Sequence, residues 1–222
     1  MDGGMLLAVD SCGAVGSIAL GRFADGRIDQ IDLLGETQIA AGELSVKLVP
    51  GIADLLAEAG VRVGALAGIV AVAGPGSFTG IRIGLAAMKA LAEAALLPVV
   101  TISRLALLAE LGQASCAVLD AHRGQFYCGM YGVDGTREML LTAGEINAMG
   151  GLAGRVAVCE ETVAQLLEEL YGEPELIRVP APNAGDALRF SLEKWRAGEF
   201  ADVAALDGYY LRGADAKVSA KS

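Results

Sequence analysis

Residues 68–97 read GIVAVAGPGSFTGIRIGLAAMKALAEAALL and contain the clearest signals of the fold class. The run GIVAVA at residues 68–73 is short, apolar and rich in β-branched side chains, which is typical of a strand buried on both faces. The loop GPGSFTG at residues 74–80 follows it directly and leads into a helix that we expect over residues 77–97. A buried strand that passes through a glycine loop into a helix indicates an α/β protein.

The predicted helix over residues 77–97 is apolar on almost every side. Its charged residues are Arg82, Lys89 and Glu93, whose spacing places them in one narrow stripe. Such a helix has to be covered nearly all round, and one sheet covers a single side. We therefore predict that it meets another subunit together with the helix expected over residues 44–60, a central position in the domain being the alternative. The predicted interface residues are Leu48, Ile52, Leu55, Ile81, Leu85, Met88, Leu91 and Ala92.

A membrane span has to be considered for residues 63–81, because these 19 residues contain no charge. Glycines and Pro75 interrupt the segment, however, and its continuous apolar part is only as long as a strand. We interpret the segment as a buried strand that runs into a loop. The sequence therefore predicts no membrane association.

The elements expected on either side of the glycine loop form two similar halves. In the first half we predict strands over residues 5–10, 15–21 and 27–35 and a helix over 44–60, with a later start near residue 49, caused by Pro50, as the alternative. Strand 68–73 and helix 77–97 follow. In the second half we predict strands over 115–120, 126–133 and 137–142, helix 143–149, strand 155–159, helix 161–171, strand 176–179 and helix 183–198. These patterns predict a duplicated α/β unit. We divide the chain into domains 1–104 and 105–222. In an alternative division, the C-terminal segment packs back on the first domain.

Composition excludes several functional classes. The 17 Lys and Arg residues against 27 Asp and Glu give a formal net charge of −10, so a basic surface for nucleic acid is not expected and any contact with RNA passes through a partner. The single histidine, His122, excludes zinc sites that need two. The four cysteines show no CxxC spacing and lie in apolar stretches, which predicts reduced thiols and a cytoplasmic protein. The N-terminal residues lack the features of a signal peptide.

The residues that could carry chemistry give no complete catalytic motif. The loop at residues 74–80 misses the spacing of a Walker A loop, of a dinucleotide fingerprint and of a nucleophile elbow. It is either a phosphate cradle or a structural turn in which Ser77 or Thr79 caps the helix. Asp10 with Ser11, and Asp120 in the second half, follow predicted strands and suit either a Mg²⁺-nucleotide site or ordinary strand ends. We predict no catalytic residue, no metal site and no cofactor.

Four segments of the chain resemble one known family. They are GPGSFTGIRIGLAAMKALA at residues 74–92, MLLAVDSCGAVGSIAL at 5–20, VLDAHRGQFYCG at 118–129 and ALDGYYLR at 205–212, and together they resemble the TsaB (YeaZ) family. The family motif falls on Gly74, Pro75, Gly76, Ser77, Phe78, Thr79, Gly80 and Arg82. The resemblance implies two duplicated actin/Hsp70/sugar-kinase-like (ribonuclease H-like) domains.

The resemblance also implies a function. Such a protein is a subunit without catalysis of its own that dimerises with a TsaD-type threonylcarbamoyltransferase, for threonylcarbamoyladenosine modification of tRNA next to the anticodon. It is a homodimer when alone, and a TsaE-like ATPase joins the assembly. Asp10, Ser11 and Asp120, read from the residues themselves, are candidates for a vestigial nucleotide site. Leu44-Ser45-Val46 stand where many relatives carry His-Ser-Glu, so no role of that His or Glu transfers to this chain.

Two alternatives to the scaffold hypothesis follow from the residues themselves. One is an actin-fold ATPase or small-molecule kinase that holds Mg-ATP with Asp10, the loop at residues 74–80 and Asp120. The other is a hydrolase that uses Ser77 or a cysteine with His122. The peptidase label used for the family is not supported, because one histidine cannot build a zinc peptidase site.

Overall fold

A computed structural model describes residues 3–24, 27–133, 135–171 and 175–211. The chain forms two compact units, unit 1 with Met1–Ser103 and Asn183–Tyr209, and unit 2 with Arg104–Pro182 and Tyr210–Ser222. Unit 1 therefore contains residues 183–209, a segment that the simple division after residue 104 placed in the second half. Residues 214–222, which the sequence predicts to be a frayed tail, lie outside the described residues.

Unit 1 is built on a five-stranded sheet with the order β3-β2-β1-β4-β5. Its central strand β1 pairs antiparallel with β2 and parallel with β4, and the outer strands β3 and β5 are antiparallel to β2 and parallel to β4. Strand β4 is buried along its whole length, as its apolar sequence predicts. The strands are β1 (Gly4–Asp10), β2 (Gly16–Ala24), β3 (Arg27–Ile39), β4 (Gly68–Gly74) and β5 (Val99–Ser103).

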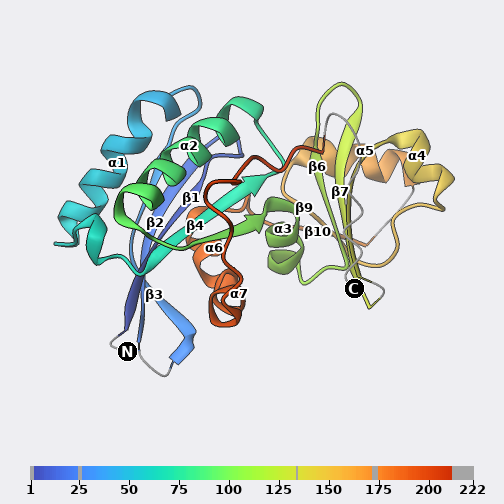
Figure 1. Ribbon diagram of the computed structural model, residues 1–222. Helices are drawn as coiled ribbons and strands as arrows, with labels where there is room; N and C mark the ends of the chain where they lie inside the picture. Colours follow the sequence, from blue (N-terminus) through green and yellow to red (C-terminus); the bar gives the residue numbers. More distant parts are fainter. Residues whose placement is uncertain (1–2, 25–26, 134, 172–174, 212–222) are drawn as a thin grey trace. The chain divides into compact units, whose positions relative to one another are not determined.

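Helices cover both faces of the first sheet. Helices α1 (Leu44–Glu58) and α2 (Phe78–Ala95) lie side by side on one face, while α6 (Ala184–Phe190) and α7 (Leu192–Ala197) lie on the other (Figure 1). The short 3-10 helix η1 (Val63–Ala65) precedes β4. The first turn of α6 is joined to the sheet by a hydrogen bond of 2.8 Å from the Ala184 N–H to the Ser17 Oγ.

The alternative in which Pro50 delays the start of α1 is wrong, because the helix begins at Leu44 and contains Pro50. Leu44, Leu48 and Ile52 are buried along one side of the helix and hold the turn before Pro50 in place. Pro50 and Val46 both face solvent. The carbonyl group of Val46, which loses its partner because proline has no N–H, is therefore on the wet side of the helix, where the loss is tolerated.

The sequence patterns did not predict strand β5 or the break between α6 and α7. Helix α2 ends at Ala95, and the C-cap residue Leu96 adopts a left-handed conformation with φ 54°. No glycine therefore marks the end of the helix before β5. The helix predicted over residues 183–198 is interrupted at Ser191, a fully buried residue whose hydroxyl donates to the Leu188 carbonyl at 2.8 Å. Such a backbone-directed hydroxyl bends a helix.

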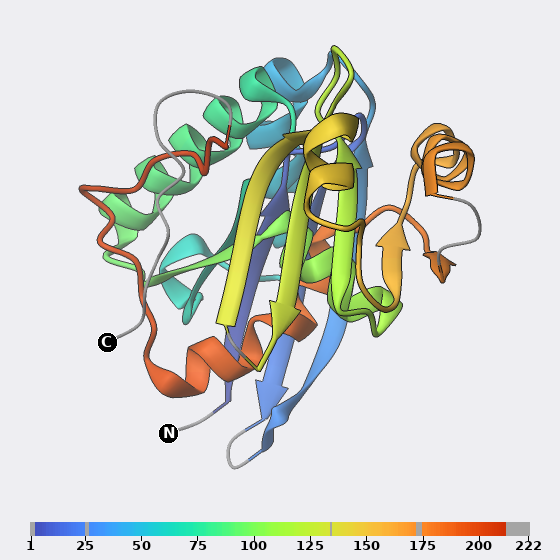
Figure 2. The same ribbon diagram turned by 90° about the vertical axis from the view of Figure 1, so that its right-hand side faces the viewer.

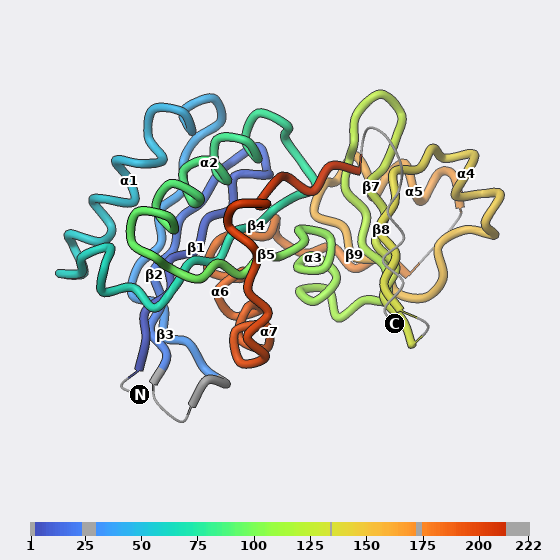
Figure 3. The backbone as a smooth tube through the Cα atoms, viewed as in Figure 1, coloured from blue at the N-terminus to red at the C-terminus, as the bar shows by residue number. Residues whose placement is uncertain are grey.

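The segment that follows α7 returns along the edge of the first sheet (Figure 3). The Ala201 N–H donates to the Val99 carbonyl and the Tyr209 N–H to the Ala73 carbonyl, each at 2.8 Å. The Lys89 ammonium group donates to the Ala204 carbonyl at 2.7 Å. These contacts cover part of the edge that β5 would otherwise leave open.

Unit 2 repeats the topology of unit 1. Its sheet has the order β10-β9-β6-β7-β8, in which β6 pairs antiparallel with β7 and parallel with β9, as β1 does with β2 and β4. Strands β8 and β10 correspond in the same way to β3 and β5. The predicted duplication of an actin-like, ribonuclease H-like unit is confirmed. The strands are β6 (Cys116–Asp120), β7 (Gln125–Gly132), β8 (Gly135–Thr142), β9 (Val156–Val158) and β10 (Leu176–Arg178).

The second sheet also carries helices on both faces. Helix α3 (Arg104–Gly112) packs on one face of this sheet. Helices α4 (Ala143–Ala148) and α5 (Glu161–Tyr171) pack on the other face, which is turned toward the viewer in Figure 2. A capping box fixes the start of α4, since the Thr142 Oγ1 accepts from the Glu145 N–H and the Glu145 carboxylate accepts from the Thr142 N–H. The hydrogen bonds from Thr142 to the ionised Glu145 lower the pKa of that carboxyl.

No helix in the described ranges is long and apolar enough to cross a membrane. The uncharged residues 63–81 form η1, the buried strand β4, the glycine loop and the first residues of α2. The interpretation of this segment as a strand that runs into a loop is confirmed.

The cysteines differ in how far solvent reaches them, and this predicts their reactivity. Cys12, Cys116 and Cys128 are buried, whereas Cys159 is partly exposed. Burial raises the pKa of Cys116 and raises that of Cys128 to about 12, so neither forms the reactive thiolate near neutral pH. In the native protein at pH 8 we expect iodoacetamide to modify Cys159 first, as peptide mass spectrometry would show. Faster modification of Cys128 would contradict the packing of the second sheet.

Candidate functional site

The glycine loop at residues 74–80 is closed against the segment that joins β1 to β2. The Ser77 N–H donates to the Cys12 carbonyl at 2.8 Å. The Ser77 Oγ then accepts from the Gly80 N–H at 3.2 Å and caps α2, as the structural interpretation of the loop expects. A Cβ atom at Gly76 would overlap the Cys12 carbonyl oxygen, so the close approach of the two segments requires glycine there.

Two further glycines extend this contact along α2. A Cβ atom at Gly80 would overlap the Ser11 carbonyl oxygen, and one at Gly84 would overlap the Ser11 Oγ. The helix therefore rests directly on the chain at Ser11, which is 2% exposed. A phosphate group bound at a helix N-terminus needs the space next to the first turn. At α2 the Ser11–Cys12 backbone occupies that space, and the geometry favours a structural turn over a phosphate cradle.

Asp10 and Ser11 lie buried at the end of β1. The Asp10 side chain is 1% exposed, and its Oδ1 accepts from the Cys12 N–H at 2.8 Å. This hydrogen bond turns the chain after the strand, which is a common use of an aspartate at such a position. The role of Asp10 and Ser11 in a vestigial nucleotide site stays a prediction.

Asp120 occupies the corresponding place in unit 2, at the end of β6. Its carboxylate accepts from the His122 N–H at 2.7 Å and lies 3.0 Å from the His122 Nδ1. Its own N–H donates to the Glu160 carboxylate at 2.7 Å. The next residues, Arg123 and Gly124, have positive φ and make the tight turn into β7. Asp120 therefore orders a hairpin, and among the described residues no cluster of three metal-ligating side chains is present.

Most of the predicted interface residues are buried within unit 1 itself. Leu48, Ile52, Leu55, Ile81, Leu85, Met88 and Ala92 are at most 6% exposed, and Leu91 is partly exposed. They attach α1 and α2 to the sheet and to each other. These side chains therefore point into unit 1, and their part in an interface between subunits stays a prediction.

The outward sides of the same helices carry apolar stripes beside exposed charged residues such as Asp54 and Glu93. On α1 the exposed residues include Val46 and Val49, which are 72% and 60% exposed, and Pro50, Ala53 and Ala57. Their spacing of three or four residues places them in one stripe. On α2 the exposed residues include Ala86, Ala90 and Ala94. We call this surface of α1 and α2 the outer helix face.

At one end of the outer helix face an aromatic and a cationic side chain are paired. Phe78 is 53% exposed, and the Arg82 guanidinium lies 3.8 Å above the centre of its ring. Both residues belong to the motif that resembles the family, and the sequence predicts no role for them. The pair holds an exposed aromatic ring in one position, and ordered aromatic and arginine side chains are common at the centres of protein interfaces.

The substituted family positions 44–46 also lie at the start of α1. Leu44 is buried, and its side chain fills the space that a Cβ atom at Gly16 would occupy. Val46 points outward and continues the apolar stripe. Leu44 and Val46, at the positions where the resemblance implies His and Glu, thus add one contact to the core and one to the outer helix face.

Comparison with known proteins assigns the chain to a protein family. Residues 37–205 match the family model of TsaD, tRNA N6-adenosine threonylcarbamoyltransferase. The chain belongs to this family. It is 33% identical to the Bacillus subtilis tRNA threonylcarbamoyladenosine biosynthesis protein TsaB over 130 residues, which are 57% of this chain and 54% of that protein. The Escherichia coli TsaB is 28% identical over 132 residues, which are 57% of this chain and 54% of that protein.

The three-dimensional comparison extends the similarity to the whole fold. YeaZ from Pseudomonas aeruginosa superposes with a TM-score of 0.72 at 26% sequence identity, covering 95% of this chain and 100% of that one. The resemblance to TsaB and YeaZ that the residues of the glycine loop predict is confirmed. In sequence, the chain spans about half the length of the curated relatives it matches.

Proposed function

We propose that the chain takes part in tRNA threonylcarbamoyladenosine biosynthesis as a non-catalytic subunit that binds a TsaD-type threonylcarbamoyltransferase through the outer helix face. The same face joins two copies when the protein is alone. A TsaE-like ATPase joins the complex, and tRNA is contacted by the partner subunits.

The observation that carries this proposal is the apolar outer helix face itself. Val46 and Val49 are more than half exposed, although valine is normally buried. The alanines along α2 let a second helix approach closely, because the distance between packed helices depends on the side chains between them. A pair of adjacent helices with apolar outer sides fits a partner that presents helices of the same kind.

The packing of the glycine loop supports a subunit without its own catalysis. Gly76, Gly80 and Gly84 bring α2 onto the chain at Ser11 and Cys12, so the motif builds a rigid support for the helix. This support fixes the direction in which Phe78 and Arg82 leave the first turn of α2. The formal net charge of −10 agrees with indirect contact to tRNA, since phosphate binding needs a surplus of Lys and Arg.

The proposal is tested by the mass of the protein in solution, with and without the TsaD homologue encoded in the same genome. We expect size-exclusion chromatography with light scattering to show a homodimer that becomes a one-to-one complex when the homologue is added. Both assemblies use one face, so they should exclude each other. A monomer that does not bind the homologue would contradict the proposal. A homodimer that binds the homologue without dissociating would show that the heterocomplex uses a different surface.

A further inference from the structure

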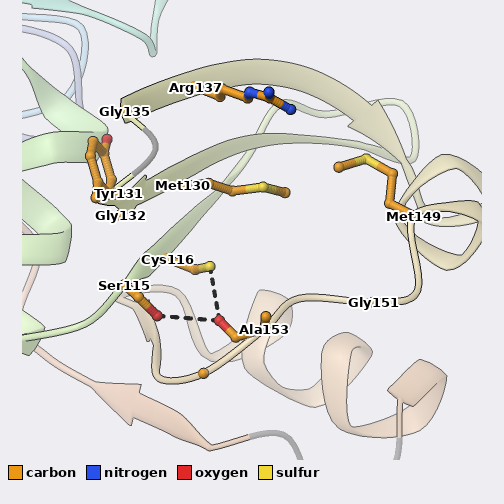
Figure 4. A pocket seen from close by; sticks show the side chains of 11 residues that line it. Ser115, Cys116, Met130, Tyr131, Gly132, Gly135, Arg137, Met149, Gly151 and Ala153 are labelled. Carbon is orange, nitrogen blue, oxygen red and sulfur yellow. Dashed lines mark hydrogen bonds between the residues drawn. The ribbon is translucent and has the colours of Figure 1, made fainter.

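Unit 2 contains a cavity of about 510 Å³ outside the surfaces discussed so far. It lies where the β7–β8 hairpin extends past the end of α4, and the loop after that helix forms its other wall (Figure 4). Its volume falls within the range of about 300–1,000 Å³ that is typical of sites for small molecules. Two of its lining residues, Cys116 and Met130, also belong to the core packed beneath α4 and α5.

The floor of the cavity is one row of side chains across three strands. Cys116 of β6 is directly opposite Met130 of β7, and Met130 is directly opposite Arg137 of β8. Directly paired residues point to the same face of a sheet, with Cβ atoms about 5 Å apart. The row therefore presents a thiol, a thioether and a guanidinium to the same space.

The opposite wall is anchored to this floor. The Ser115 Oγ donates to the Ala153 carbonyl at 3.2 Å and the Cys116 Sγ donates to the same oxygen at 3.3 Å (Figure 4). Met149, at the start of this loop, directs its side chain into the cavity from the side opposite Met130 (Figure 4). Two thioethers thus face each other across an opening that hydrogen bonds hold in shape.

Arg137 gives the cavity a positive edge in an acidic protein. No described residue forms an ion pair or a hydrogen bond with its guanidinium, whereas Arg155 and Arg178 of the same unit pair with glutamates. A free guanidinium binds a carboxylate in a two-pronged geometry. Methionine sulfur makes favourable contacts with aromatic rings at about 5 Å and adapts to their shape.

We propose that this cavity is a binding site for a small aromatic carboxylate, whose ring lies between Met130 and Met149 and whose carboxylate pairs with Arg137. Cys116 closes the floor as a neutral thiol, because burial raises its pKa. The site lies wholly within unit 2 and does not depend on the outer helix face.

Methyl NMR of the full chain with ¹³C-labelled methionine tests this directly, with 2-naphthoate as the probe. The sequence holds six methionines, so the spectrum is simple to assign with Met130→Leu and Met149→Leu. We expect saturable shifts of the Met130 and Met149 methyl signals at millimolar probe or below. The signal of Met88, which is fully buried in unit 1, should stay unchanged. Absence of saturable shifts at Met130 and Met149 would overturn the proposal.

The contribution of Arg137 has its own matched control. Arg137→Gln should weaken 2-naphthoate binding about tenfold, the effect of one charge-assisted interaction. The same variant should leave binding of the neutral 2-naphthylmethanol unchanged. Arg123→Gln, at an exposed arginine in the β6–β7 turn, should change neither. Equal 2-naphthoate affinity in the wild type and Arg137→Gln would show that the carboxylate is not recognised and would overturn the proposal.

Discussion

Val49→Glu is expected to weaken the complex with a TsaD-type partner by on the order of 100-fold or more. Val49 is 60% exposed in the middle of the apolar stripe of α1, so a glutamate there stays hydrated in the free chain and unit 1 keeps its fold. In the complex the carboxylate would be buried against apolar side chains without a cation. An unpaired buried charge costs about 3–5 kcal/mol, and each 1.4 kcal/mol is about tenfold in affinity. Titration calorimetry measures the affinity and circular dichroism checks the fold.

The chain offers a matched control for this substitution. Val133 lies in unit 2 in the turn between β7 and β8 and is fully exposed, so Val133→Glu introduces the same charge away from the outer helix face. It should bind the partner as the wild type does. Equal affinity of Val49→Glu and Val133→Glu would exclude the outer helix face as the interface. Leu85→Glu cannot serve in this test, because Leu85 is 6% exposed and its replacement would damage the core.

The fold was largely predictable because the core elements carry clear patterns. The buried strand β4 is a continuous apolar run, and the strand pairs that open each half are short apolar segments separated by tight turns. Errors arose where a local signal was absent or misleading. Strand β5 follows a helix end at Leu96 that carries no glycine, and Pro50 suggested a later start of α1 than the buried leucines around it allow. In both places packing outweighs the local preference of the residue.

The candidate site was less predictable, and the cause lies in the composition of α2. An amphipathic helix reveals its inward side through contrast between apolar and polar residues. In α2 most residues on both sides are apolar, so the sequence does not distinguish buried Leu85 and Met88 from outward Ala86 and Ala90. The sequence does not predict the cavity in unit 2 either, for a different reason. Its floor joins Cys116, Met130 and Arg137, which only the register of the sheet brings together.

Gly80→Ala is expected to destabilise unit 1 by about 2–3 kcal/mol, although the same change in most helices is favourable by about 1 kcal/mol. The new methyl group would overlap the carbonyl oxygen of Ser11, a buried backbone atom that cannot rotate away as the end of a flexible side chain could. Helix α2 would have to move away from the β1–β2 segment. That movement weakens the bonds from the Gly80 N–H to the Ser77 Oγ, at 3.2 Å, and from the Ser77 N–H to the Cys12 carbonyl, at 2.8 Å.

Scanning calorimetry of the full chain should show this loss as a fall of about 5–10 °C in the Tm of the transition that unfolds unit 1. Gly64→Ala is the matched control, since a Cβ atom at Gly64 in η1 meets no other atom within 4 Å and its Tm should stay close to that of the wild type. An unchanged or higher Tm for Gly80→Ala would mean that the β1–β2 segment yields easily. In that case the glycines of the loop would not be explained by close packing, and the space beside the first turn of α2 would again be open to a ligand such as phosphate.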